Sequence, residues 1–164
     1  MPRQILFLFA FLLGCSWLCV ACGDDDPSHQ DPCPPGATSE VCQVFFLVNE
    51  ARVDNGLEPY VYDRHLARAA QEHARDMVDN NYFSHTSLDG RSFVDRINAT
   101  AYAGSPRGEN IAKGQRTPEQ VMSSWMGSSG HRANILSAGS NEIGVGFYQN
   151  TWVQVFGFRR PVTP

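Results

Sequence analysis

The 164-residue sequence lacks several features that would point to common functions. It has no glycine-rich loop with the spacing that cradles phosphates, so we do not expect a nucleotide-dependent enzyme. It shows no internal repeat, and its length suits one domain with appendages. Arg3 and five of the acidic residues precede Val41, which leaves 12 of 13 basic and 12 of 17 acidic residues from there onward. A neutral domain without a basic cluster argues against nucleic acid as a partner.

The sequence also lacks a cysteine that we would expect to act as a nucleophile. Two of its five cysteines lie inside the apolar N-terminal run. If Cys22 is acylated, only Cys33 and Cys42 remain. An even pair in an exported chain is more often a disulfide than a metal site or a nucleophile. We therefore predict a disulfide between Cys33 and Cys42.

The N-terminal segment has the layout of a secretory signal. Residues Ile5 to Ala21 are almost wholly apolar, follow Arg3 and give way abruptly to aspartates. A run of about 17 apolar residues could in principle span a bilayer. The sequence around Cys22 nevertheless resembles a bacterial lipoprotein processing site. Cys15 fits the local pattern better but has apolar sequence after it, so we favour Cys22.

These features predict the organisation and location of the chain. We expect a lipoprotein signal peptide at residues 1–21, an acidic, proline-rich tether at 22–42 and a folded domain at 43–160. The protein would be secreted to the cell envelope and reach the membrane through its lipid anchor only.

Apolar periodicity predicts mainly helices in the first part of the domain. The second of them has the clearest signals, because Asp63 can cap it and its apolar stripe reaches about Asn80. The expected segments are a helix from Gln43 to Asn55, the helix after Asp63, a short helix from Ser92 to Asn98, a loop from Asn98 to Arg107, a helix that starts at Thr117 and ends at Gly127–Gly130, and a short turn from Ala133 to Leu136.

The C-terminal part has strand character. Apolar residues alternate from Ile143 to Tyr148, and Thr151 to Phe158 is nearly continuously apolar, so we expect a hairpin that turns at Gln149 and Asn150. A strand that is apolar on both faces must be covered on both sides. The predicted fold class is α+β, a three-layer α-β-α sandwich.

Three titratable residues beside glycines or small residues are candidates for a functional site: His85, Glu109 and His131. Each is expected near the end of an element, where the backbone can turn or approach closely. His65 and His73 lie eight residues apart inside a predicted helix, and we interpret both as structural.

Several motifs, taken in order, resemble one known family. They are Ala70-Gln71 with His73-Ala74, Tyr82-Phe83-Ser84-His85, Gly108-Glu109-Asn110-Ile111-Ala112, Trp125, Gly130-His131-Arg132-Ala133-Asn134-Ile135-Leu136, Ile143-Gly144-Val145-Gly146 and Trp152-Val153-Gln154-Val155-Phe156. In this order they are similar to the CAP superfamily, also called the SCP-like extracellular domain, and most similar to its bacterial branch. The resemblance runs from about Gln43 to Phe158 and implies an α-β-α sandwich.

In eukaryotic members the family has a cavity in which two histidines and two acidic residues can hold a divalent metal. His85 and Glu109 match the first histidine and the acid of the Gly-Glu-Asn motif. The other two positions depart, because Ser128 stands where the second acid is expected and Thr151 or its neighbour where the second histidine is expected. His131 is the available substitute. A metal site of His85, Glu109 and His131, holding zinc or a similar ion, is the resulting expectation.

The same three groups without metal could instead form a hydrogen-bonded acid-base network. We carry three functional hypotheses. The first is an anchored binding module whose cleft holds a metal, lipid, envelope component or protein. The second is a metal-assisted hydrolase or protease with Glu109 as base; a hydrolase built on Ser84 and His85 is a weaker variant. The third is a purely structural domain.

Overall fold

The computed structural model describes residues 33–160. The predicted signal peptide, the Cys22 and Cys15 lipidation sites and the first part of the tether lie outside the described residues. The elements are α1 (Ser39–Asp54), β1 (Val61–Tyr62), α2 (Arg64–Asp79), α3 (Phe93–Asn98), β2 (Ser105–Lys113), α4 (Pro118–Met126), α5 (Ser129–Ile135), β3 (Glu142–Tyr148) and β4 (Thr151–Phe158).

One four-stranded sheet forms the middle layer, in the order β1-β3-β4-β2. Strand β1 runs parallel to β3, and the other neighbours are antiparallel. The predicted hairpin joins β3 to β4, with Gln149 and Asn150 both at positive φ. Two such residues in sequence give the backbone twist that suits a two-residue hairpin turn.

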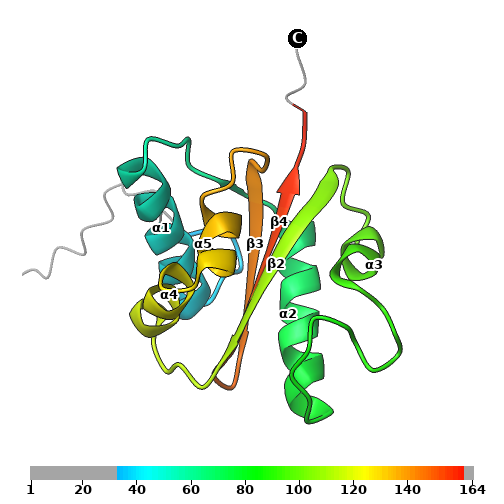
Figure 1. Cartoon of the computed structure of the whole chain (residues 1–164). Helices are drawn as coiled ribbons and strands as arrows, with labels where there is room; N and C mark the ends of the chain where they lie inside the picture. The colour runs from blue at the N-terminus through cyan, green and yellow to red at the C-terminus, as the bar shows by residue number, and fades with distance from the viewer. Residues whose placement is uncertain (1–32, 161–164) are drawn as a thin grey trace, which may run out of the picture. The chain divides into compact units, whose positions relative to one another are not determined.

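Helices cover both faces of this sheet, which confirms the predicted three-layer sandwich. Helix α2 packs on β3 and β4, with α3 beside it, while α1, α4 and α5 lie on the opposite face (Figure 1). Strand β4 is buried along nearly its whole length, as a strand covered on both sides must be. Each face has its own apolar core, one around Trp125 and Trp152 and the other around Leu66 and Met77.

Strand β2 corrects the expected loop between Asn98 and Arg107. The strand begins at Ser105 and pairs with β4 as far as Lys113, with an irregularity between Pro106 and Gly108. Proline, glycine and charged residues disfavour a strand locally. Long-range pairing with the buried β4 outweighs that preference, so Glu109 lies within a strand and not at the end of a loop.

Two helices also differ from the expected ranges. Helix α1 begins at Ser39, four residues before the predicted start, because the Thr38 side chain accepts a hydrogen bond from the Val41 N–H and caps it there. The segment that holds His131 is helix α5, where we expected only a turn. The second helix starts at its predicted cap, where Asp63 accepts from two backbone N–H groups.

Cys33 and Cys42 form the predicted disulfide, with their Cα atoms 5.1 Å apart. The bond joins the chain before α1 to the first turn of that helix. The last part of the predicted tether is thus folded onto the domain.

Candidate functional site at His85 and Glu109

Glu109 is a buried carboxylate with both oxygens engaged. Its place in β2, opposite Val155 of β4, leaves its side chain 1% exposed. Oε1 lies 2.8 Å from the Nδ1 atom of His85, and Oε2 accepts a hydrogen bond of 2.6 Å from the Nη2 group of Arg96. Burial of a charged group is costly unless it is paired and hydrogen-bonded, and here it is both.

His85 lies in the segment between α2 and α3, with its side chain 54% exposed. Its Nδ1 faces the Glu109 carboxylate, which can only accept, so Nδ1 carries the hydrogen and donates it. No residue in the described part of the chain bonds its Nε2. In the neutral ring this nitrogen keeps a lone pair for a partner from outside.

The segment around His85 is held by two buried side chains. His73 of α2 binds the Ser84 carbonyl oxygen through Nε2, at 3.0 Å. Arg96 of α3 donates from Nη2 to the His85 carbonyl oxygen, at 3.0 Å, and from Nη1 to the Ser87 hydroxyl, at 3.1 Å. The backbone before and after the imidazole is therefore fixed, and this positions the ring.

Sequence reasoning missed Arg96, and it did not predict that His73 would hold the backbone beside His85. Both are buried polar residues: His73 shares the apolar stripe of α2 with Met77, and Arg96 precedes the buried Ile97 in the predicted short helix. A polar residue on an apolar stripe was the available signal. As expected, His73 is structural, and so is His65, whose Nδ1 lies 2.6 Å from the Thr100 carbonyl oxygen.

Two pKa shifts accompany this arrangement. Burial lowers the pKa of His73, and the charge of Arg96 lowers it further, while Glu109 and Asp76 act in the opposite direction. Burial also lowers the pKa of His131, and the neighbouring His85 adds to that effect. Both histidines thus favour their neutral forms.

His131 lies near enough to His85 for the charge of His85 to contribute to the lowered pKa of the His131 ring, but the structure does not bring His131 into the His85–Glu109 hydrogen bond. Its backbone carbonyl accepts from the Asn110 side chain, at 3.1 Å. Asn134, on the same helix, donates to the Glu109 carbonyl oxygen at 3.2 Å and to Asn110 Oδ1 at 2.8 Å. This partly buried amide network fastens α5 to the strand that carries Glu109.

The residues present do not fit a three-ligand metal centre well. Within residues 33–160, no group of three or more His, Cys, Asp and Glu side chains is placed to hold a metal ion. The guanidinium of Arg96 also occupies the second oxygen of Glu109. The metal site of His85, Glu109 and His131 therefore stays a prediction, and we derive no chemistry through it.

Ser84 does not form a catalytic pair with His85 in this geometry. Its hydroxyl accepts from the Thr86 N–H, at 3.1 Å, in a local turn. Its carbonyl is bound by His73. The arrangement gives no support to a serine hydrolase built on adjacent residues.

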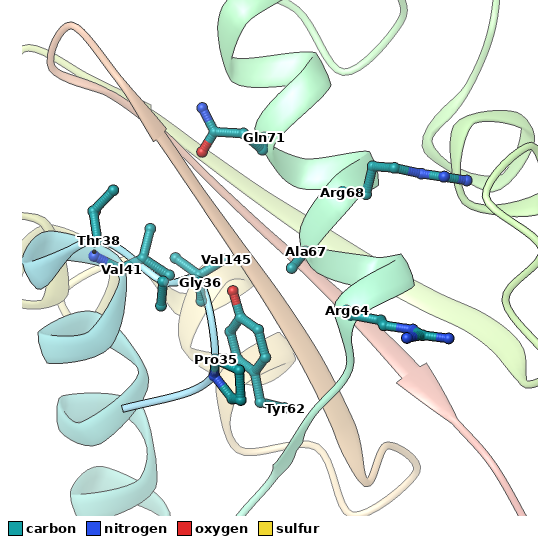
Figure 2. Close-up of a pocket in the computed structure, with 11 residues that line it drawn as sticks. Pro35, Gly36, Thr38, Val41, Tyr62, Arg64, Ala67, Arg68, Gln71 and Val145 are labelled. Carbon is teal, nitrogen blue, oxygen red and sulfur yellow. Dashed lines mark hydrogen bonds between the residues drawn. The ribbon is translucent and has the colours of Figure 1, made fainter. Parts of the chain in front are cut away.

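A separate cavity of about 250 Å³ lies between the start of α1 and the first half of α2 (Figure 2). Tyr62 and Val145 line it, together with residues 35–38 of the loop that the disulfide closes. Arg64 and Arg68 belong to its lining, but both side chains point away from Tyr62 in Figure 2. None of the three predicted site residues lines this cavity, so the histidine chemistry lies elsewhere.

Comparisons with known proteins agree with the fold and with the motifs. Residues 45–156 match the family profile "CAP: Cysteine-rich secretory protein family". The protein YkwD of Bacillus subtilis is 39% identical over 125 residues, which cover 75% of this chain and 49% of YkwD. The membrane protein YlbC of the same organism is 34% identical over 119 residues, covering 73% of this chain and 34% of YlbC. The chain belongs to the CAP, or cysteine-rich secretory protein, family.

Solved structures give the same result. An extracellular protein with an SCP domain from Bacillus anthracis superposes with a TM-score of 0.71 and 33% identity, over 73% of this chain and 40% of that one. An outer surface protein of Borrelia burgdorferi has a TM-score of 0.64 at 24% identity, covering 71% of this chain and 90% of its own, which shows the shared fold. The chain spans about half the length of YkwD and a third of YlbC. Within residues 33–160, no helix is both long and apolar enough to cross a membrane.

Proposed function

We propose that this protein is an extracytoplasmic CAP domain that binds a ligand through the Nε2 atom of the half-exposed His85 side chain. The observation that supports this most directly is the geometry of the pair: a half-exposed imidazole is held through Nδ1 by a buried carboxylate. Such a carboxylate fixes the tautomer and the orientation of the ring. A ring held in this way is preorganised to meet a partner, which reduces the entropy lost on binding.

The binding proposal can be tested by proton NMR of the His85 ring. The full chain is titrated with soluble peptidoglycan fragments and, separately, with vesicles of phosphatidylglycerol and phosphatidylethanolamine. We expect one probe to shift the His85 ring signals while those of His65, which bonds a backbone carbonyl, stay in place. Identical binding by the parent and by His85→Ala, or no shift with either probe, would contradict the proposal.

A second candidate is a hydrolase, favoured by the same hydrogen bond. A histidine oriented by a buried carboxylate is the usual arrangement of a general base. The metal-assisted form, with Glu109 as base, gains no support from this site, because Arg96 already binds the second oxygen of Glu109. Turnover of a peptide or ester that His85→Ala abolishes and His65→Gln leaves intact would establish the activity. Equal turnover by both variants would assign it to a contaminant.

We also propose that the protein acts in the cell envelope, anchored by a lipid on Cys22. Support comes from the apolar run that ends at Ala21 and from relatives described as extracellular and outer-surface proteins. Mass spectrometry of the mature N-terminus tests this directly. A chain that starts at Met1, an unmodified Cys22, or a lipid on Cys15 would each require a different account. A single acyl chain binds membranes only marginally, so we expect more than one.

A further inference from the structure

We propose that Arg96 is a specificity-determining residue that makes the His85–Glu109 site select against divalent cations. Its guanidinium already binds Oε2 of Glu109, so this carboxylate oxygen is not free to bind a metal ion. This inference rests on the proposed binding role of His85 and concerns the kind of ligand that the site accepts.

Hydrogen bonds on both sides of its guanidinium hold the Arg96 side chain in position. Its side chain is 6% exposed and makes four hydrogen bonds. Nη1 donates to the Ser87 hydroxyl and to the Arg91 carbonyl oxygen, while Nη2 donates to the His85 carbonyl oxygen and to Glu109 Oε2. A planar guanidinium with several acceptors loses most of its freedom, so it cannot swing aside for a ligand.

The charges at the site already balance without a metal. One buried guanidinium faces one buried carboxylate, with Nη2 2.6 Å from Oε2. A divalent ion on Glu109 would lie close to this fixed positive charge, where little water remains to screen the repulsion. A guanidinium stays protonated under all ordinary conditions, so deprotonation cannot relieve the conflict.

The His85 ring adds a second obstacle. The nitrogen that faces Glu109 is Nδ1, and it donates its hydrogen to Oε1. A metal bridging both residues would have to break this hydrogen bond and turn the ring, because a ligating nitrogen must be free of hydrogen. The partner that suits the site is instead an uncharged or anionic molecule whose O–H or N–H group can donate to Nε2 of the neutral ring.

Three substitutions of Arg96 in the full chain test the inference. Arg96→Met removes the charge and keeps the length, Arg96→Gln removes the charge and keeps hydrogen-bond donors, and Arg96→Lys keeps the charge. Arg91→Met is the matched control, because Arg91 is an exposed arginine of the same segment that pairs with Asp89. Each protein is titrated with Zn²⁺ by calorimetry and with Co²⁺ by visible absorption at pH 7.5, and circular dichroism reports whether it is folded.

We expect the parent, Arg96→Lys and Arg91→Met to show no metal uptake that depends on His85. Arg96→Met, or Arg96→Gln if the methionine variant does not fold, should bind both ions at least about tenfold more tightly than the parent does, because the repelling charge is gone. Adding His85→Ala should remove that gain. A residue with only a structural role would not create a metal site when replaced.

Stoichiometric zinc binding by the parent that His85→Ala abolishes would overturn the inference, as would folded uncharged variants that gain no affinity. These outcomes are distinct from failure of the proposed function. The latter is detected by the NMR titration of His85 with envelope probes, which involves no metal.

Discussion

Replacement of Gly144 by alanine is the sharpest test of how the sheet and the site are coupled. Strand β3 passes so close to α2 that a Cβ atom on Gly144 would lie 2.1 Å from the amide nitrogen of Ala67 and 2.1 Å from the carbonyl carbon of Leu66. Both neighbours are backbone atoms, so no side-chain rotation can make room. The helix and the strand would have to separate by about 1 Å to restore ordinary contact distances.

We expect this separation to cost about 3 kcal/mol or more. Extra atoms in a well-packed core typically cost about 1–3 kcal/mol, and this case belongs at the upper end because two backbones must move. A loss of that size is a large fraction of the roughly 5–15 kcal/mol that stabilises a domain. Urea unfolding followed by circular dichroism measures it, and the melting temperature should fall by on the order of 10 °C.

Gly130→Ala is the matched control. A Cβ atom on Gly130 meets nothing within 4 Å, and the residue lies in helix α5, where alanine is the better helix former. This change should be neutral or stabilise the protein by up to about 1 kcal/mol.

In Gly144→Ala, displacement of α2 should also move His73, which holds the Ser84 carbonyl, and so shift the NMR signals of the His85 ring. A Gly144→Ala protein within about 0.5 kcal/mol of the parent would refute the close approach.

Three further predictions concern the supports of the site and of the domain. Burial keeps the folded-state pKa of His73 below the unfolded value of about 6.5, so the free energy of unfolding should fall as pH drops below about 6.5. Urea unfolding at pH 7.5 and pH 5.5 measures this fall. The fall should be smaller in His73→Gln than in the parent, whereas His65→Gln should show the same fall as the parent. Reduction of the Cys33–Cys42 disulfide should lower the free energy of unfolding by at most about 2–3 kcal/mol, since the bond closes a short loop, and the reductant should leave that of a Cys33→Ser, Cys42→Ser double variant unchanged. Asn134→Ala should cost about 1–3 kcal/mol by leaving buried acceptors on β2 unpaired, and an unchanged melting temperature would contradict the role of that network.

Local signals were enough to predict most elements of the fold. Helix α2 is found from Asp63 and from an apolar stripe that ends near Asn80, because capping and periodicity act within a few residues. The β3–β4 hairpin is found for the same reason, from alternation and from two adjacent turn residues. The two-sided burial of β4 then required helices on both faces.

Strand β2 could not be predicted in the same way. From Ser105 to Lys113 its residues include proline, glycine and three charges, none of which favours a strand. Its conformation comes from pairing with β4, whose partner residues lie 38 to 53 positions later in the chain. The predicted start of α1 was wrong for a similar reason. Thr38 caps the helix, and the Cys33–Cys42 disulfide holds its first turn, inside a segment whose composition is typical of a tether.

The candidate site shows where motif reasoning stops. Gly108-Glu109-Asn110 and the histidine at position 85 were sufficient to predict that a carboxylate and an imidazole meet, and they lie 2.8 Å apart. The ligand that a buried carboxylate can bind depends, however, on which cation neutralises its charge. The sequence Gly108-Glu109-Asn110 does not show whether that cation is a metal ion or a guanidinium. Here that group comes from α3, a six-residue helix whose place against β2 follows from packing. Because Arg96 lies 13 residues before Glu109 in an unrelated element, only the folded chain shows that the negative charge of the site is already matched by a positive one.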